Sequence, residues 1–327
     1  MKLLINPAKN YLNHKKSLIE SIGREEHIVQ NMHIVVILVN YNGMKDTIEC
    51  IESIEKSTVK SQIVVVDNAS KENEAEKISQ QFPKVKTIRS ETNGGFSAGN
   101  NIGIQWALEQ GYEYIALLNN DTVIAPNMLE LLCQNTSDTS VSTPKMLYFS
   151  KPNIIWYGGG HFNKKTGNVG HEYLNKKDPE DMAVRECDYA TGCCIMIPSS
   201  VFEKTGLLDE RFFMYCEDSE FCLRLKENGI GINYVPAAKL WHKIGQSTGG
   251  AESALSMYYI TRNRILYLKD YKQEFEPTAL AYTIVTRIIR MIQMIVKGKP
   301  EWKAFRKGIS DGIKGVTGKV DLAWLEK

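Results

Sequence analysis

Three consecutive polar side chains, Asn119, Asn120 and Asp121, stand where a short apolar run ends, and their types suit cation binding. Asn119 and Asp121 are two residues apart, so in extended chain they point to the same side. An amide oxygen and a carboxylate on one side can ligate Mg²⁺ or Mn²⁺ and leave coordination positions for phosphate and water. The alternative is an Asx turn before Pro126, and the segment by itself does not decide between the two.

An alternation of strands and helices positions these residues. Strands are predicted over 34–39, 63–66, 85–89 and 115–118, with helices over 47–56, 72–81 and around Trp106. This order predicts an α/β fold with a doubly wound, mostly parallel sheet flanked by helices. Ligands of such sheets bind at the carboxyl ends of the strands, where Asn40, Asp67 and Asn119 stand.

Length, charge and cysteine usage exclude several other classes of protein. A chain of 327 residues forms one large or two modest domains. The net charge of +2 gives no reason to expect a nucleic-acid partner. Seven scattered cysteines without a Cys-x-x-Cys pair indicate reduced thiols in a cytoplasmic protein. The first 31 residues lack the apolar core of a signal peptide, and no run of 18 uncharged apolar residues predicts a membrane-spanning helix.

Beyond Pro126 the pattern predicts a smaller mixed region. Strands are expected over 141–147, 154–157, 190–198 and 232–235, with a loop-rich stretch at 161–186 and helices over 128–134 and 201–205. Glu217 and Asp218 follow an aromatic run and begin another helix, whose macrodipole stabilises their negative charge. Such acids either cap the helix or take a proton from a substrate.

Short motifs follow one another in a fixed order along residues 34–265. They are Val39-Asn-Tyr-Asn42, Val66-Asp-Asn-Ala-Ser70, Asn93-Gly-Gly-Phe-Ser-Ala-Gly-Asn100, Asn119-Asn-Asp121, Thr191-Gly192, Glu217-Asp218 and His242. Each motif is weak alone, but the ordered set is specific. It resembles family 2 of the inverting, sugar-nucleotide-dependent glycosyltransferases, which have the GT-A fold. Within that family, the chain looks most like the bacterial rhamnosyltransferase-type branch.

The resemblance implies a role for each motif on the donor side. Asp67 would accept a hydrogen bond from the imide N–H of a uracil or thymine base. Asp121 and Asn119 would hold Mg²⁺ or Mn²⁺ on the diphosphate, with His242 as a third contact. Because Asn119 replaces the family's usual first Asp, weaker metal binding is expected. The other residues expected around the nucleotide are Asn40, Asn42, Asn93, Gly94, Gly95, Asn100 and Asn120.

On the acceptor side, the resemblance makes Asp218 the general base, with Glu217 as a second catalytic acid beside it. A sugar hydroxyl is a poor nucleophile until a base takes its proton, and a carboxylate can do so. Thr191 and Gly192 would border the acceptor.

The implied reaction transfers a sugar, with rhamnose from dTDP-rhamnose as the expected donor and UDP-linked sugars as the alternative. The acceptor would be a saccharide or a lipid-linked glycan in bacterial cell-surface polysaccharide synthesis. The expected division is an appendage over 1–31, a nucleotide-sugar-binding half over 32–136, an acceptor-binding and catalytic half over 137–265, and a basic helical tail over 266–327.

Apolar residues at helical spacing mark residues 278–296 in this tail. Tyr282, Val285, Ile289, Ile292 and Val296 fall on one face. A core helix or a homodimer contact would use such a face. The alternative is a helix lying on an anionic membrane through residues 278–307, with the protein peripheral on the inner face of the cell membrane.

Two other functions fit parts of the sequence. Gly95-Phe-Ser97-Ala-Gly99 matches the Gly-x-Ser-x-Gly elbow of serine hydrolases, and Asp209 or Asp218 followed by His242 completes the chain order. That elbow directly follows a strand, whereas residues 90–94 intervene here. The second alternative is a sugar-nucleotide-binding module without turnover, because an amide replaces the usual carboxylate in the cation motif.

Overall fold

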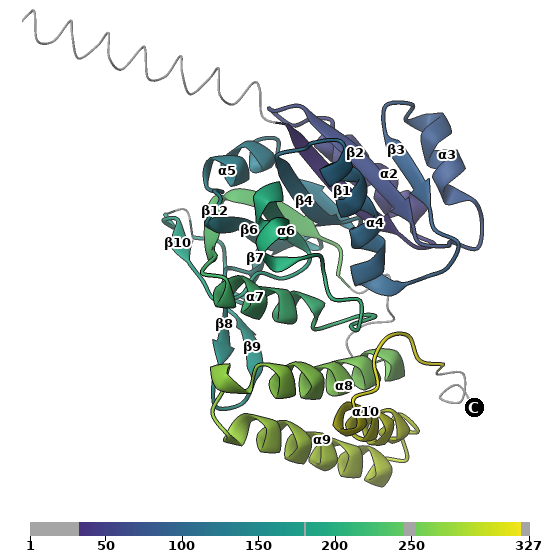
Figure 1. Ribbon diagram of the computed structural model, residues 1–327, viewed down its shortest axis with the longest axis vertical. Helices are drawn as coiled ribbons and strands as arrows, with labels where there is room; N and C mark the ends of the chain where they lie inside the picture. The colour runs from purple at the N-terminus through teal and green to yellow at the C-terminus, as the bar shows by residue number, and fades with distance from the viewer. Residues whose placement is uncertain (1–32, 180, 245–252, 322–327) are drawn as a thin grey trace, which may run out of the picture.

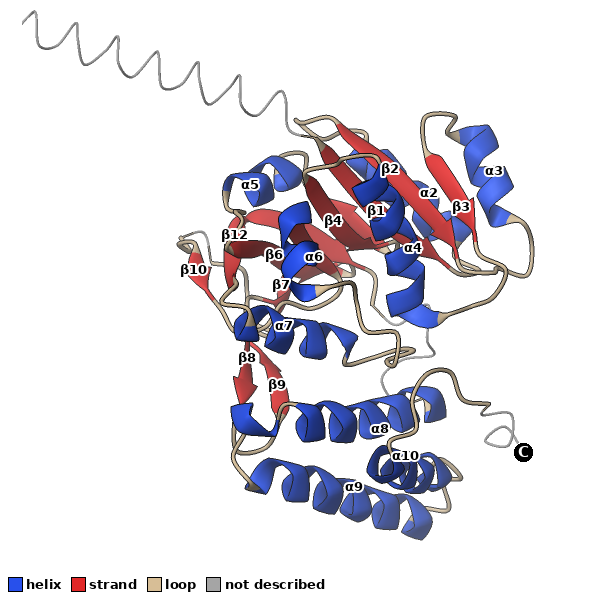
Figure 2. Ribbon diagram, in the orientation of Figure 1, coloured by secondary structure: helices blue, strands red, loops and turns tan. Residues whose placement is uncertain are grey.

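The computed structural model describes residues 33–179, 181–244 and 253–321 (Figure 1). A central sheet lies between helices, and three C-terminal helices form a further layer below it (Figure 2). The appendage expected over residues 1–31 lies outside the described residues.

The first half of the sheet is parallel, as the alternation of strands and helices predicts. Its strands are β1 (Ile34–Asn40), β2 (Ser61–Asp67), β3 (Lys86–Arg89) and β4 (Tyr114–Asn119), in the spatial order β3-β2-β1-β4. The apolar runs of β1, β2 and β4 are buried on both faces. Because the strands are parallel, their polar carboxyl ends share one edge of the sheet.

Three helices connect these strands. The first two follow the steps from β1 to β2 and from β2 to β3, towards one edge of the sheet, and the third connects β3 back across the sheet to β4. The helices are α2 (Met44–Ile54), α3 (Glu74–Gln81) and α4 (Gly95–Glu109). Right-handed crossovers therefore put α4 on the opposite face from α2 and α3.

Helix α4 begins at Gly95, so most of the Asn93–Asn100 motif lies in a helix. Gly99 and Gly103 face β1, where a Cβ would lie 2.8 Å from Val39 Cγ1 and 2.6 Å from Ile37 Cγ2, respectively. The two glycines let the helix pack closely on the strand. This contact offsets the low helix propensity of glycine.

The second half of the sheet is mixed. β11 (Cys194–Pro198) is antiparallel to β4, and next to it in space lie β6 (Ser140–Tyr148), β12 (Gly231–His242) and β10 (Arg185–Glu186). β5 (Thr122–Ile124) pairs with β12, and β7 (Lys151–Tyr157) pairs with β6.

β12 is longer than the strand predicted over 232–235. The strand resumes after a register shift between Val235 and Lys239, around Pro236. Its last residue, His242, pairs with Thr122 of β5. The extension thus brings His242 next to the cation motif at the end of β4.

The remaining helices beside the sheet are α5 (Met128–Gln134), α6 (Ser199–Thr205) and α7 (Glu217–Glu227). The stretch expected to be loop-rich contains a hairpin, β8 (Gly160–Asn163) and β9 (Asn168–His171), which reaches the C-terminal layer (Figure 1). That layer comprises α8 (Ala254–Asp270), the 3₁₀ turn η1 (Lys272–Glu274), α9 (Thr278–Val296) and α10 (Trp302–Lys314). Tyr267 of α8 donates to the Gly167 carbonyl of the hairpin at 2.5 Å, which joins the two parts.

Candidate active site

Polar residues at the ends of β1, β2 and β4 form one hydrogen-bonded chain. Asn40 donates to Glu74 Oε2 at 2.7 Å and to Asp67 Oδ1 at 3.4 Å. Thr47 Oγ1 donates to Asn40 Oδ1 and accepts from Asn120 Nδ2, both at 2.8 Å. Asn40 is fully buried with both ends of its amide in use, so it positions its neighbours rather than facing a ligand.

Asp67 holds a free acceptor at this edge. Its Oδ1 accepts from the N–H of Ser70 at 3.2 Å, while its Oδ2 is shielded from water and has no hydrogen-bond partner among the described residues. Arg89 lies 3.4 Å from Oδ2, close enough for attraction between the charges but outside hydrogen-bond geometry. A buried acceptor without a donor is costly. Oδ2 is therefore a candidate acceptor for the N–H of a donor base.

The turn before α4 is fixed at the same edge by Asn68. Asn68 donates from Nδ2 to Asn93 Oδ1 at 3.2 Å and accepts from the N–H of Gly94 at 3.2 Å. The N–H of Gly95 donates to Asn93 Oδ1 at 2.9 Å. These bonds satisfy the polar groups of the turn locally.

Asn42 and Asn100 differ in position. Asn42 is exposed, and its Oδ1 accepts from the N–H of Lys71 at 2.9 Å. Asn100 is buried inside α4 and donates to the Phe96 carbonyl at 3.0 Å. The structure therefore brings Asn42, but not the Asn100 side chain, to the open edge of the sheet.

Asp121 and His242 form a buried pair beyond the end of β4. His242 Nε2 lies 3.1 Å from Asp121 Oδ1, and Nδ1 of the same ring has no hydrogen-bond partner in the described part of the chain. The Trp156 ring packs edge-on against the imidazole with 4.7 Å between centroids. Asn119 is half-buried, two residues from Asp121.

The donor atoms of this pair fit a divalent cation that takes its other ligands from phosphate and water. Neighbouring ligands of an octahedral ion with bonds of about 2.1 Å lie about 3.0 Å apart. The observed 3.1 Å between Asp121 and His242 is close to this spacing. No cluster of three or more His, Cys, Asp or Glu side chains surrounds one point within the described ranges. The structure thus brings Asp121 and His242 together as a small donor set, while the part of Asn119 and the weak metal binding stay predictions.

The Asp218 carboxylate, at the start of α7, accepts four hydrogen bonds. Oδ2 accepts from the Tyr189 hydroxyl at 2.5 Å and the N–H of Gly192 at 3.1 Å. Oδ1 accepts from the N–H and hydroxyl of Ser219, at 2.7 and 3.3 Å. A carboxylate has about four lone-pair positions, so an incoming hydroxyl replaces one of these donors. The bond from Ser219 Oγ is the longest and therefore the easiest to replace.

Glu217 has a different environment from its neighbour. It is 7% exposed and borders a small, mostly apolar cavity that Asp218 and Gly192 also line. Its Oε2 has no hydrogen-bond partner among the residues described. Burial, and after it the charge of Asp218, raises the pKa of Glu217 well above its ordinary value. Burial disfavours the charged form of Glu217, so Asp218 is the better candidate for accepting a proton, and the role of Glu217 as a second catalytic acid stays a prediction.

Glu217→Gln is expected to stabilise the protein increasingly as the pH rises. The unfolded chain releases the Glu217 proton near its ordinary pKa of 4.5, whereas the folded chain keeps it to higher pH. The wild type therefore loses unfolding free energy above pH 4.5, by about 1.4 kcal/mol per pH unit while the two states differ by one proton. Urea unfolding at pH 5, 6.5 and 8 should show a widening advantage of the variant. A constant difference would mean that folded Glu217 is ionised.

The segment that leads into Asp218 has an unusual backbone. Tyr215 and Cys216 have φ angles of 66° and 68°, in the left-handed region that non-glycine residues rarely adopt. Asn263 of α8 donates to the carbonyl oxygens of Met214 and Tyr215, at 2.8 and 2.7 Å. Such a conformation persists when its surroundings hold it, so Asn263 is a positioning residue for Asp218.

Two consecutive residues connect the cation motif with Asp218. The N–H of Gly192 donates to Asp218, and the carbonyl of Cys193 accepts from the N–H of Asn119 at 2.8 Å. Thr191, which precedes them, is buried in the same turn. Because one short turn contacts both motifs, Asn119 and Asp218 border the same site.

A row of rings joins the same two ends of the site. Trp156 contacts His242 at 4.7 Å and His171 at 5.0 Å between centroids. His171 stacks on Tyr189 at 6.1 Å, and Tyr189 donates to Asp218. No sequence pattern marks these rings, because each stands alone in a different segment.

Ser97 lies inside α4 and not on an elbow between a strand and a helix. It is fully buried, and its hydroxyl donates to the Phe212 carbonyl at 3.2 Å. A hydrolase nucleophile is exposed on a sharp turn. The structure therefore argues against the hydrolase alternative.

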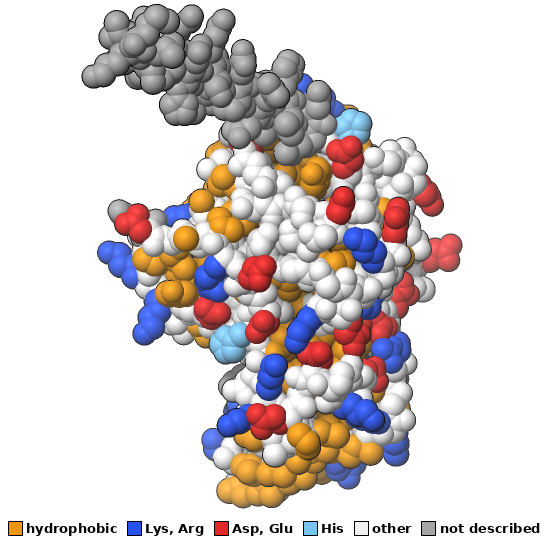
Figure 3. All heavy atoms as spheres, turned by 60° about the vertical axis from the view of Figure 1, so that its left-hand side comes forward, with side chains coloured by type: hydrophobic (Ala, Val, Ile, Leu, Met, Phe, Trp, Pro, Cys, Tyr) orange, Lys and Arg blue, Asp and Glu red, His pale blue; other side chains and the backbone are white. Residues whose placement is uncertain are grey.

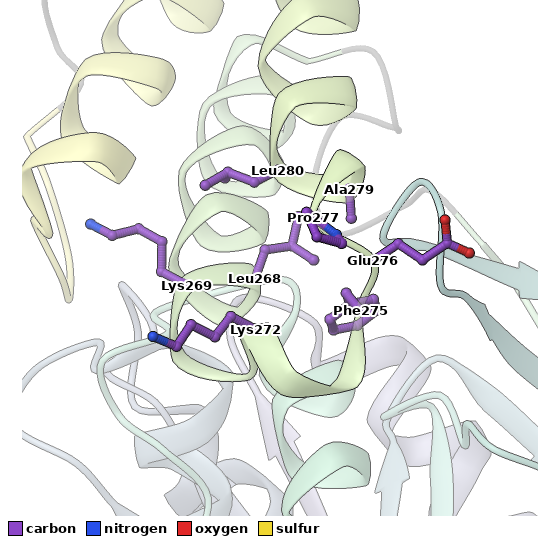
Figure 4. A pocket seen from close by; sticks show the side chains of 8 residues that line it. All are labelled: Leu268, Lys269, Lys272, Phe275, Glu276, Pro277, Ala279 and Leu280. Carbon is purple, nitrogen blue, oxygen red and sulfur yellow. The ribbon is translucent and has the colours of Figure 1, made fainter.

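A cavity of about 340 Å³ lies away from all of these residues, where α8 leads into α9 (Figure 4). Its walls are apolar, and Lys269 and Lys272 extend from α8 and the following turn, on the side away from Glu276. None of the expected site residues borders this cavity, so it is separate from the site at the sheet edge.

Comparison with known proteins agrees with the motifs. The chain matches the family described as glycosyl transferase family 2 over residues 35–206, more than half of its length. The low-salt glycan biosynthesis hexosyltransferase Agl10 of Haloferax volcanii is 28% identical over 295 residues, which cover 87% of this chain and 92% of that protein. The dTDP-rhamnosyl transferase RfbF of Shigella flexneri is 25% identical over 300 residues, 88% of this chain and 98% of that protein.

Two solved structures share the fold. GalNAc-T7, crystallised with UDP, GalNAc and Mn²⁺, has a TM-score of 0.58 and 18% identity, covering 74% of this chain and 50% of that chain. Residues 1–349 of S. aureus TarS have a TM-score of 0.53 and 16% identity, covering 88% of this chain and 83% of that chain. These likenesses confirm the predicted GT-A-type α/β fold. With the family match and the enzyme relatives, they lead to one conclusion: the chain belongs to glycosyl transferase family 2 and is a glycosyltransferase.

Proposed function

We propose that this protein moves rhamnose or a related hexose from a dTDP- or UDP-linked donor to a saccharide or lipid-linked glycan, with inversion. The observation that carries the proposal is the turn Gly192–Cys193, which contacts both Asn119 and Asp218. A donor diphosphate at one motif and an acceptor hydroxyl at the other would flank a single sugar ring. Relatives named for hexosyl and dTDP-rhamnosyl transfer support this donor class.

In the proposed reaction, the acceptor hydroxyl attacks the anomeric carbon as its proton passes to Asp218. The new glycosidic bond forms opposite the bond to the diphosphate oxygen, which breaks and leaves its electron pair on the nucleoside diphosphate. Tyr189 and Gly192 orient the base by donating to it. Asp67 would fix the donor's base through its free Oδ2.

We infer that Asp121, His242 and Asn119 hold a divalent cation on the donor diphosphate. Mg²⁺ or Mn²⁺, when bound, stabilises the negative charge that gathers on the leaving group. The contact between Asp121 and His242 keeps their donor atoms at a common point.

We place the protein on the cytoplasmic face of the cell membrane, in the synthesis of bacterial cell-surface polysaccharide. The sequence predicts no spanning helix because Arg287 and Arg290 interrupt the apolar run. Nevertheless α9 is long and apolar enough to cross a membrane by length and composition. It packs on the protein through Ala279, Thr283 and Arg287, which supports a helix lying on the surface.

A panel of sugar nucleotides should identify the donor. The true donor should raise the unfolding free energy by about 2.7 kcal/mol at about 100 times its Kd, and a thermal shift assay measures the rise. Nucleotide release from that donor should require both an acceptor and Mn²⁺, and EDTA should slow it. Donor binding without acceptor-dependent release would instead favour the module without turnover.

A further inference from the structure

Arg264 and Arg287 each have a buried Nε that binds no anion among the described residues. Arg287 of α9 is 9% exposed, and its Nε has no hydrogen-bond partner among the described residues; its recorded contact is the Phe305 ring at 6.0 Å. Arg264 of α8 donates to Asn168 Oδ1 at 2.6 Å, but its Nε is also buried without a partner within the described ranges. A buried N–H of a guanidinium group without a partner costs free energy that a bound anion would offset.

Arg224 and Arg262 show what a structural role looks like here. Arg224 binds Glu220 through two parallel bonds of 2.9 and 2.7 Å. Arg262 is fully buried and donates to the Gly318 carbonyl at 2.7 Å and to Asn263 Oδ1 at 2.8 Å, although its Nη2 has no hydrogen-bond partner among the described residues. Arg287 has neither a carboxylate nor a carbonyl partner in the described part of the chain, so packing alone does not explain its position.

Contacts of the neighbouring residues place Arg264 and Arg287 beside the segment that leads into Asp218. Burial, then Arg264 and Arg290, lower the pKa of Arg287 to about 10, which leaves it charged at neutral pH. Asn263, next to Arg264 in α8, donates to the Met214 and Tyr215 carbonyls. Thr283, one turn before Arg287 in α9, donates to the Thr166 carbonyl of the β8–β9 hairpin, which Arg264 also contacts. An anion held between the two arginines would therefore lie near the carboxylate that receives the acceptor proton.

The outer face of α9 is apolar along its length. Its exposed apolar side chains are Tyr282, Val285, Ile288, Ile289, Ile292, Ile295 and Val296. They belong to the hydrophobic surface at the lower end of Figure 3, on the helix that lies farthest from the sheet in Figure 1. Residues 278–314 also contain eight Lys and Arg residues against two acidic ones, which suits an anionic surface.

We propose that Arg264 and Arg287 bind the diphosphate of a lipid-linked acceptor whose lipid chain enters the membrane on which α9 lies. This inference rests on the proposed function and adds the chemical class of the acceptor. Two guanidinium groups can share the oxygens of a diphosphate through charge-assisted N–H bonds. The acceptor's sugar then reaches Asp218, while its lipid chain leaves along α9.

The first experiment measures binding to phosphatidylcholine vesicles that carry either a polyprenyl diphosphate or an equal charge of phosphatidylglycerol. The metal-free wild type should prefer the diphosphate vesicles. Arg287→Gln and Arg264→Gln should each lose about tenfold in this affinity, as expected for one bond to a charged group. Arg306→Gln removes an equal charge from an exposed position on α10 and is the matched control, which should keep the preference.

Three results of this experiment would overturn the proposal. Wild type that does not distinguish the vesicles has no diphosphate site. A loss by Arg306→Gln equal to that of Arg287→Gln would mean that the arginines add only general charge. Self-association of the wild type without vesicle binding would assign the α9 face to a second copy of the chain.

The second experiment distinguishes acceptor binding from donor binding and from a structural role. With a saccharide on a polyprenyl diphosphate as acceptor, Arg287→Gln should raise the acceptor KM about tenfold and leave the donor KM unchanged. Its Tm should be unchanged or higher, because an unpaired buried charge is removed. A lower Tm with an unchanged acceptor KM, or a raised donor KM instead, would contradict the proposal. Wild type that binds diphosphate vesicles but transfers no sugar would refute the proposed function and not the anion site.

Discussion

Asp218→Asn is expected to lower kcat for sugar transfer by about 10²- to 10⁴-fold, the usual contribution of a general base. The amide has nearly the same shape and can still accept hydrogen bonds from Tyr189 and Gly192, but it cannot take a proton from the attacking hydroxyl. Donor affinity, measured by thermal shift, should stay unchanged because the proposed nucleotide contacts lie at the ends of β1 and β2.

Glu217→Gln is the matched control, since it removes the adjacent carboxylate from the same helix end. Burial raises the pKa of Glu217 well above its ordinary value and so disfavours its charged form, and this variant should therefore keep a kcat close to that of the wild type. Equal losses in the two variants would show that any change at the start of α7 damages the site. Undiminished transfer by Asp218→Asn would remove Asp218 as the base.

Gly95→Ala is expected to lower the free energy of unfolding by about 3 kcal/mol or more, from backbone strain and a direct clash. Gly95 has a φ of 87°, and a Cβ there would lie 1.9 Å from the Phe213 carbonyl oxygen. That oxygen accepts from the N–H of Phe96 at 2.9 Å, so the two chain segments cannot separate without losing this bond. The same shift would move the segment that leads into Asp218, and kcat should fall with stability.

Gly229→Ala distinguishes the clash from the backbone conformation. Gly229 has a φ of 68°, and a Cβ there would meet nothing within 4 Å. It should cost about 1–2 kcal/mol, the strain of a left-handed residue alone. Urea unfolding measures both variants. Similar losses of unfolding free energy in the two variants would mean that the clash with Phe213 contributes little. The reason for a glycine at position 95 would then be the predicted close approach to the nucleotide.

The parallel half of the fold was predictable because its signals are local. Residues 34–39, 63–66 and 115–118 are continuous apolar runs, and strands buried on both faces require such runs. Residues whose conformation depends on a neighbouring strand were misleading in the sequence. Gly99 and Gly103 suggest a loop until β1 is known to lie against them, and Pro236 hides the second half of β12.

The candidate site divides in the same way. Asp67, Asp121 and Asp218 each follow a strand or begin a helix within a short motif, so the sequence predicts them directly. Tyr189 and Trp156 meet Asp218 or His242 only through tertiary contacts, and no local spacing marks them. Some residues that act through tertiary contacts can be recognised once their burial is known. Thr261, Arg262 and Asn263 are consecutive polar residues buried in one helix, a placement that needs a reason.

The contact of Asn263 with the Met214 and Tyr215 carbonyls has a consequence for how the protein can be divided. The helix that provides this amide continues, through η1, into the one with the apolar outer face. Trimming the chain ahead of residue 254 to obtain a soluble core would therefore remove a brace of the reaction centre together with the lipid-facing helix. The proposed membrane binding and the positioning of Asp218 therefore depend on the same connected helices. A chain that ends before residue 254 would lack the Asn263 contact that positions Asp218.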